Sequence, residues 1–178
     1  MFEKANPDSV ANWLGRPAMD GRELLEPINL IIVDEASSSE AQSRQRLIQA
    51  FTEAGFGPRL GHSSGYFGRM NGDFYPQTPT QNETAFADFM WVFTNNHARM
   101  FGPFNNNGNW VWIGSSSREK GTIHDYVSFK ESRDRMSGFL VERAGLEYLG
   151  DFPLENVVNS SSQQTGDHDG FAKLLKIK

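Results

Sequence analysis

The sequence has no cysteine, no long apolar run and no cluster of basic residues. The lack of cysteine excludes disulfides, thiolate metal sites and a cysteine nucleophile. No stretch approaches the roughly 20 apolar residues of a membrane-spanning helix, and the first residues lack the basic and apolar regions of a signal peptide. A net charge of −5 without a Lys/Arg run argues against nucleic-acid binding, because phosphate backbones bind clustered cations. These absences lead us to expect a soluble cytoplasmic protein.

The composition is that of a globular protein, and its length suits one domain over residues 1–178. An apolar, β-branched run from Pro27 to Val33 predicts a strand buried on both faces. Ser37, with Glu40 three residues later, predicts a capping box at the start of a helix that ends at Gly55.

The middle of the chain predicts strands separated by turns. Residues 56–82 are rich in glycine and proline but also contain aromatic side chains, so we expect them to cover the sheet as an ordered segment. Phe86 to Phe93 predict a strand. Asn107-Gly108 predicts a two-residue hairpin turn between two further strands.

The remaining elements complete the predicted fold. Residues 122–129 indicate a strand, and Ser128 caps a second helix that ends at Gly145. The fold class that follows is α+β: a mixed, largely antiparallel sheet with a central hairpin and two main helices packed on it. Residues 1–14 are expected to form an N-terminal extension, and residues 156–169 a polar loop.

The central hairpin gathers the candidate site residues. Side chains alternate between the two faces of a strand, so His97, Arg99 and Phe101 share one face. A regular register across the hairpin turn places Trp110 and Trp112 on the same face.

Two later elements add to this face if they adjoin it. His124 and Tyr126 share one side of the next predicted strand. Arg133 lies in the first turns of the second helix, where a cation is unfavourable unless an anion pairs with it. That anion is either a bound ligand or Asp134, in a structural pair.

This combination of residues is typical of a ligand-binding cleft, with aromatic walls and a few polar groups. Arg99 and Arg133 suit a phosphate or carboxylate, and His97 and His124 can act as acid and base near neutral pH. The alternative is a face that water simply covers. No cofactor is expected, and a metal site is disfavoured because Asp125 faces away from His124.

Several short motifs follow one another between about Gly15 and Ile177: "GRP", "EPINLIIV", "NHARMF", "VWIG", "IHDYVSF" and "DGFAKLLKI". Their order is similar to that in the C-terminal domain of LssY-type proteins. Members often follow a membrane-embedded lipid-phosphatase-like domain, which this sequence does not contain, and the segment before their second histidine is often longer. The motif positions carry over directly to His97, Arg99, Trp112, Gly114, His124, Arg133 and Asp134. The resemblance implies that His97, Arg99 and His124 form one set, without naming a reaction.

Two functions are open at this point. One is binding of a small anionic or phosphorylated ligand, with hydrolysis of a phosphate ester by His97 and His124. The other is a non-catalytic regulatory or interaction module that binds a protein chain, a lipid headgroup or a membrane-associated partner. The sequence does not decide the oligomeric state.

Overall fold

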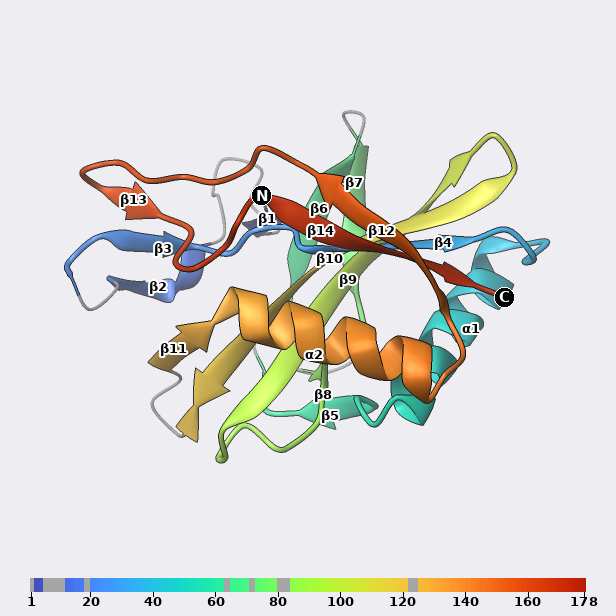
Figure 1. The fold of residues 1–178 in the computed structure, drawn as a ribbon, viewed down its shortest axis with the longest axis horizontal. Coiled ribbons are helices and arrows are strands. Elements are labelled where there is room, and N and C mark those ends of the chain that lie inside the picture. The colour runs from blue at the N-terminus through green and yellow to red at the C-terminus, as the bar shows by residue number, and fades with distance from the viewer. Residues whose placement is uncertain are drawn as a thin grey trace.

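The computed structural model describes residues 2–4, 12–17, 20–62, 65–70, 73–79, 84–121 and 125–178. In these residues, two helices lie against a large mixed sheet, and a small second sheet stands at one end (Figure 1). The α+β prediction is confirmed in this coarse form, although strands outweigh helices. The helices are α1 (Glu40–Glu53) and α2 (Phe129–Glu142). The strands are β1 (Phe2–Lys4), β2 (Asn12–Pro17), β3 (Glu23–Leu25), β4 (Leu30–Asp34), β5 (Pro58–Leu60), β6 (Tyr66–Met70), β7 (Asp73–Thr78), β8 (Thr84–Ala87), β9 (Asn95–Asn106), β10 (Asn109–Lys120), β11 (Asp125–Ser128), β12 (Glu147–Pro153), β13 (Gln163–Gln164) and β14 (Phe171–Ile177).

The large sheet is organised around the two longest strands, β9 and β10. Its main path runs β1-β6-β7-β9-β10-β4-β14-β12, with β11 beside β10, and with β8 and then β5 beside β9. The β4–β14 pair is parallel, whereas the other pairs described in this sheet are antiparallel. Strands β2, β3 and β13 form the small sheet. The predicted N-terminal extension therefore adds strands to both sheets, and β13 lies within the predicted polar loop.

The predicted central hairpin is present. Asn107 and Gly108 both have positive φ, at 54° and 91°. A type I′ turn requires this at its two central positions, and asparagine and glycine adopt it more easily than other residues. The turn therefore joins β9 to β10 as its local sequence predicts.

The helices begin at serine caps, although only one cap is where the sequence predicts it. Ser128 accepts a hydrogen bond from the backbone of Glu131 at 2.8 Å and starts α2 as expected. The prediction of a cap at Ser37 is wrong, because Ser39 caps α1. Ser37 instead donates its hydroxyl to Asp34 at 2.5 Å, which fixes the turn after β4. In the described part of the chain, neither helix is long and apolar enough to cross a membrane.

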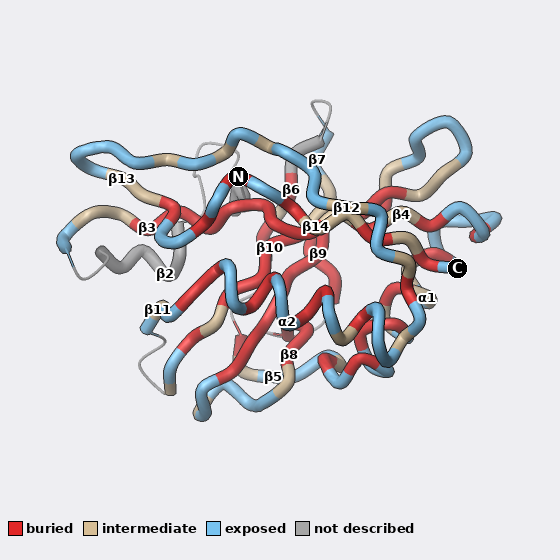
Figure 2. Tube along the Cα trace, viewed as in Figure 1, coloured by how far each residue is buried: buried red, intermediate tan, exposed pale blue. Residues whose placement is uncertain are grey.

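The main hydrophobic core lies between the two helices and one face of the sheet. Its largest buried side chains include Phe51 from α1, Phe86 from β8 and Trp112 from β10, and Met136 and Leu140 add the inner face of α2. Figure 2 shows the buried middle of β9 and β10, with exposed segments around the rim. Burial of this apolar surface drives the packing of the helices on the sheet.

Strand β6 covers the opposite face of the hairpin. Tyr66 is buried there with Phe101 and Ile28. A Cβ added at Gly68 would lie 2.5 Å from Phe101 Cβ, so the β6 backbone rests directly on this ring. The described parts of residues 56–82 thus form strands that pair within the large sheet, and β6 lies over its second face.

A bulge in β9 overturns the predicted register of the hairpin. Phe101 pairs with Ile113 and Phe104 with Val111, so β9 uses one residue more than β10 over this interval. Gly102 has φ +136° there, and Pro103 has no N–H to donate to a partner strand. Successive side chains of a strand point to opposite faces of the sheet, so one extra residue shifts the alternation in β9 relative to β10. Residues of β10 that would share a face with His97 in a regular hairpin therefore lie on the opposite face.

Candidate functional site

His97 and Arg99 lie in a buried group of charged and polar side chains on the face of the sheet away from the helices. We call this group the ionic cluster. Every member is at most 5% exposed, and together they come from β9, β10 and the segments that follow β3 and β5: Glu26, His62, His97, Arg99, Ser117 and Glu119. Charged side chains are rarely buried to this extent unless they are paired with one another.

One nitrogen of His97 stands at the centre of the ionic cluster. His97 Nε2 lies 3.0 Å from Glu119 Oε1, 3.1 Å from Ser117 Oγ and 3.3 Å from Arg99 Nη1. The His62 ring lies 4.9 Å from the His97 ring, centre to centre. A ring nitrogen either donates or accepts, so the proton position on His97 decides which of its neighbours is its partner.

Arg99 is neutralised from within the protein. Its Nη1 lies 3.3 Å from Glu26 Oε1, and its guanidinium lies 5.1 Å from the centre of the Tyr66 ring. Burial raises the pKa of Glu26; the positive charge of Arg99 partly offsets this, and the negative charge of Glu119 adds to it. The carboxyl group of Glu26 therefore takes the position beside Arg99 in which the sequence predicts an anionic ligand.

The ionic cluster lacks the geometry of a hydrolytic triad. In a Ser–His–carboxylate triad, the hydroxyl and the carboxylate approach different ring nitrogens. Here Ser117 and Glu119 both approach Nε2 of His97. In the described part of the chain, no group of three or more histidine and acidic side chains is arranged to hold a metal ion.

The two tryptophans that are predicted to form an aromatic wall beside His97 lie elsewhere. The expectation that Trp112 and Trp110 share the face of His97 is wrong, because the β9 bulge reverses the register between them. Trp112 is fully buried in the main core and donates its indole N–H to Ser43 on α1 at 3.0 Å. Trp110 donates to the carbonyl of Ser37 at 2.9 Å. Both rings fix α1 and the turn before it.

Of the two predicted site residues on the strand after the hairpin, His124 and Tyr126, the structure describes only Tyr126. Its hydroxyl donates to Asp167, and its pKa is raised by burial and by that hydrogen bond. Asp167 also accepts from the backbone of Phe129 at 2.8 Å, so Tyr126 takes part in capping α2. Burial alone would raise the pKa of Asp167, but hydrogen bonds from Ser128 and Tyr126 outweigh it and lower the pKa. His124 lies outside the described residues.

Arg133 does not converge with Arg99, contrary to prediction. Its guanidinium donates to both carboxylate oxygens of Asp169, at 2.5 and 3.1 Å, and to the carbonyl of Phe171 at 2.8 Å. Asp134 Oδ1 lies 2.9 Å from Arg133 Nε, as expected of a structural pair. These contacts tie α2 to the loop before β14. The guanidinium of Arg133 is thus bound by groups of the protein itself.

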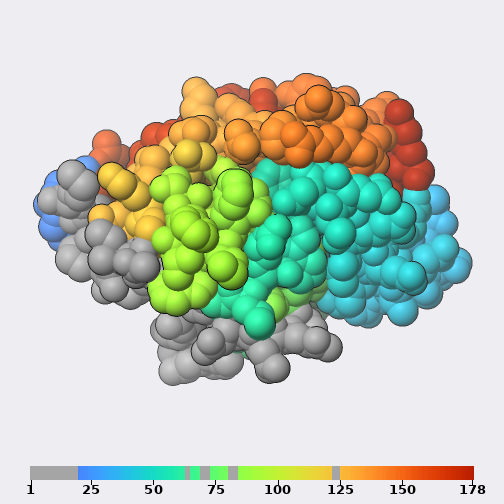
Figure 3. All heavy atoms as spheres, turned by 90° about the horizontal axis from the view of Figure 1, so that it is seen from below, coloured from blue at the N-terminus to red at the C-terminus, as the bar shows by residue number. Residues whose placement is uncertain are grey.

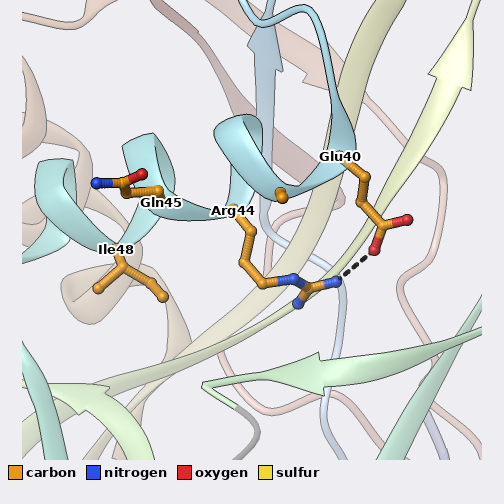
Figure 4. A pocket seen from close by; sticks show the side chains of 5 residues that line it. Glu40, Arg44, Gln45 and Ile48 are labelled. Atoms are coloured by element: carbon orange, nitrogen blue, oxygen red, sulfur yellow. Dashed lines mark hydrogen bonds and ion pairs between the residues drawn. The ribbon is translucent and has the colours of Figure 1, made fainter.

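Two surface hollows offer little to a ligand. One of about 490 Å³ lies along α1 and is lined by Glu40, Ala41, Arg44, Gln45 and Ile48 (Figure 4). Arg44 donates to Glu40 at 2.9 Å and to the Gly102 carbonyl at 3.1 Å, which uses it to hold α1 against the hairpin. Another hollow of about 290 Å³ lies beside α2, where Lys173 pairs with Asp151 at 2.8 Å.

The most unusual exposed surface is the loop of residues 88–94 between β8 and β9. Together with the end of β5 it exposes five large apolar side chains, which we call the apolar tip: Leu60 (68% exposed), Phe89 (53%), Met90 (54%), Trp91 (36%) and Phe93 (57%). The prediction of a strand from Phe86 to Phe93 is therefore wrong beyond Ala87.

Hydrogen bonds hold this loop in shape. Asp88 accepts from the Asn96 backbone at 2.8 Å and from the Asn96 side chain at 2.7 Å, which closes the base of the loop. The Phe93 N–H donates to the Met90 carbonyl at 3.0 Å and forms the turn. Trp91 lies so close to Gly61 that a Cβ at Gly61 would overlap its ring. The apolar side chains are thus presented by an ordered scaffold.

No family model, curated protein or solved structure matches this chain. The resemblance to LssY-type C-terminal domains therefore stays a prediction, as does the anionic ligand. Within the ionic cluster, the carboxyl group of Glu26 already pairs with Arg99, which weighs against that ligand.

Sequence reasoning missed most partners of His97 and the whole apolar tip. Glu119 follows Ser117 at a spacing of two, so counting the bulge at Gly102-Pro103 would have placed both on the face of His97. No local pattern in the sequence predicts the contact between Glu26 and Arg99, because the two residues lie 73 positions apart.

Proposed function

We propose that the protein is a non-catalytic interaction module that attaches to a lipid–water interface by inserting the apolar tip. The observation that carries this proposal is the exposure of four large apolar side chains within five consecutive residues, Phe89 to Phe93, beside Leu60. Single exposed apolar side chains are common, but a contiguous group marks an interaction surface.

The composition and shape of the apolar tip favour lipid over a protein partner. No charged residue occurs from Phe89 to Asn95, and tryptophan and phenylalanine are common at membrane interfaces. The backbone that carries these side chains turns at the lower edge of the molecule, before β9 (Figure 1). A bilayer adapts to such a turn, whereas a protein partner needs a complementary pocket.

The expected strength of attachment follows from the exposed area. Full burial of a Phe or Met side chain contributes about 1.5–3 kcal/mol, so each half-exposed side chain of the apolar tip contributes about 1 kcal/mol on insertion. Five such side chains give about 5 kcal/mol, which corresponds to weak, reversible binding.

Vesicle binding of two double variants tests the proposal. Phe89→Ser with Phe93→Ser should weaken binding about 30-fold, because it removes about 2 kcal/mol of apolar contact. Phe152→Ser with Phe171→Ser is the matched control, because these rings are 46% and 42% exposed on β12 and β14, away from the apolar tip. In the wild type, Trp91 emission should shift to shorter wavelength on binding, and Trp91→Phe should remove that shift.

Three results would contradict the proposal. One is equal loss of binding in the two double variants, and another is a wild type that does not bind vesicles at all. The third is a wild-type dimer in sedimentation that Phe89→Ser with Phe93→Ser converts to a monomer, because a second copy would then cover the apolar tip.

A further inference from the structure

Three arginines from different elements surround the base of the 88–94 loop. Arg59 lies on β5 and donates its Nε to the Ala87 carbonyl at 2.9 Å. Arg135 lies on α2, with its Nε 3.7 Å from Asp88 Oδ2. Arg118 lies on β10, with its Nη1 3.5 Å from Asn96 Oδ1. Their contacts meet at the residues that close the loop, Ala87, Asp88 and Asn96.

Figure 3 shows the arrangement of these elements on one face. The yellow-green part of the chain that contains the 88–94 loop lies beside the teal part that contains β5, and the orange part that contains α2 runs along both. The exposed apolar side chains of the loop therefore have Arg59 of β5 and Arg135 of α2 on neighbouring elements.

These arginines are held loosely, unlike Arg133. Arg118 and Arg135 lie 3.4 Å from Glu131 and 3.7 Å from Asp88, whereas Arg133 lies 2.5 Å from Asp169. The bond from Arg59 to a carbonyl uses one of five guanidinium N–H groups. Asp88 also has two hydrogen bonds from Asn96, so it stays paired if Arg135 turns away.

Three arginines contact the base of the loop although the whole chain is acidic. The chain carries a net charge of −5, whereas the loop base has three arginines against the carboxylates of Asp88 and Glu131. Guanidinium groups bind phosphate through paired N–H donors. We propose that Arg59, Arg118 and Arg135 form a rim that binds the phosphate groups of anionic lipid headgroups while the apolar tip inserts between them. This inference rests on the proposed attachment to lipid and adds selectivity for headgroup charge.

Vesicles of two compositions test the rim separately from the apolar tip. The wild type should bind vesicles of phosphatidylcholine with phosphatidylglycerol more tightly than vesicles of phosphatidylcholine alone, and added salt should reduce the difference. Arg59→Gln, Arg118→Gln and Arg135→Gln should each lower binding to the anionic vesicles about fivefold. None of them should change binding to phosphatidylcholine alone.

Arg22→Gln is the matched control. It removes the same charge, but Arg22 is bound to Asp20 and Asn159 next to the small sheet. Equal effects of Arg22→Gln and the three rim variants would overturn the inference, because long-range attraction would then explain the preference. Thermal unfolding of each variant shows whether a loss of binding reflects a loss of fold.

The outcomes distinguish the rim from the proposed function. Equal binding of the wild type to both vesicle types would overturn the rim and leave insertion of the apolar tip intact. No binding to either type would contradict the proposed function itself. Inorganic phosphate, compared with chloride at matched ionic strength, should raise the unfolding temperature of the wild type no more than that of the rim variants. A phosphate-specific rise that the rim variants lose would assign the rim to a free anion and overturn the lipid assignment.

Discussion

Replacing Arg99 with methionine tests whether the ionic cluster is structural. Arg99 is 4% exposed and is the permanent cation of a buried group that contains Glu26 and Glu119. Arg99→Met keeps much of the side-chain volume but leaves these carboxylates buried with less positive charge. Breaking a buried ion pair from one side costs about 3–5 kcal/mol, a large part of the 5–15 kcal/mol that stabilises an ordinary domain.

Urea unfolding measures this cost directly. With a slope of about 2 kcal/mol per molar, the midpoint should fall by about 2 M without a change of slope. Adding Glu26→Gln should recover about 1–3 kcal/mol, because the amide no longer carries a charge that needs a partner. Lys176→Met, at the exposed pair with Glu147, should shift the midpoint much less.

One result would refute this reasoning. If the free energy of unfolding of Arg99→Met lies within about 1 kcal/mol of the wild-type value, Arg99 behaves like a surface cation. The ionic cluster then does not depend on its charge. An Arg99 on an open ligand-binding face would give that result.

Four further substitutions test the loop before β14, the acid response, the cover formed by β6 and the packing of α2. Asp167→Ala should destabilise the protein by about 1–2 kcal/mol, because it removes the acceptor of the Phe129 N–H at the start of α2, and should lower the melting temperature by several degrees. The pKa of Asp169 is held at about 2 by the guanidinium that it binds, so its stabilisation is present above the ordinary carboxyl pKa of 3.8 and is lost as pH falls from about 4 to 2. Because Asp169 is partly exposed, this amounts to about 1 kcal/mol, and Asp169→Asn should abolish the pH-dependent part. Gly68→Val should destabilise the protein by about 1–3 kcal/mol, because the β6 backbone touches the Phe101 ring. Gly138→Ala should stabilise it by up to about 1 kcal/mol, because Gly138 lies within α2 and a Cβ there would meet no other atom.

The features that the sequence predicts correctly depend on residues close together in the chain. The turn at Asn107-Gly108 and the cap at Ser128 involve side chains and backbone within three or four positions. Their geometry is therefore determined locally, and the rest of the fold only has to be compatible with it.

The errors begin where distant segments or a single extra residue decide the outcome. The faces of β10 were predicted from perfect alternation, which the bulge after Phe101 breaks. Glu26 and His62 reach His97 and Arg99 only through the tertiary fold. The run from Phe89 to Phe93 is apolar enough for a buried strand, and its exposure depends on how Asp88 and Asn96 close the loop.

The parallel pairing of β4 with β14 has a consequence for how the protein is made. Leu30 pairs with Lys173, and Ile32 with Leu175. At a synthesis rate of about 5–20 residues per second, roughly 140 residues of intervening chain take about 7–28 s to emerge after β4. During that time one edge of a central, apolar strand has no neighbour, and a strand edge of this kind can pair with other chains. Contacts between such distant residues also slow folding. The nascent chain should therefore depend on chaperones until β14 is available, and removal of β14 should lead to aggregation rather than to a smaller folded protein.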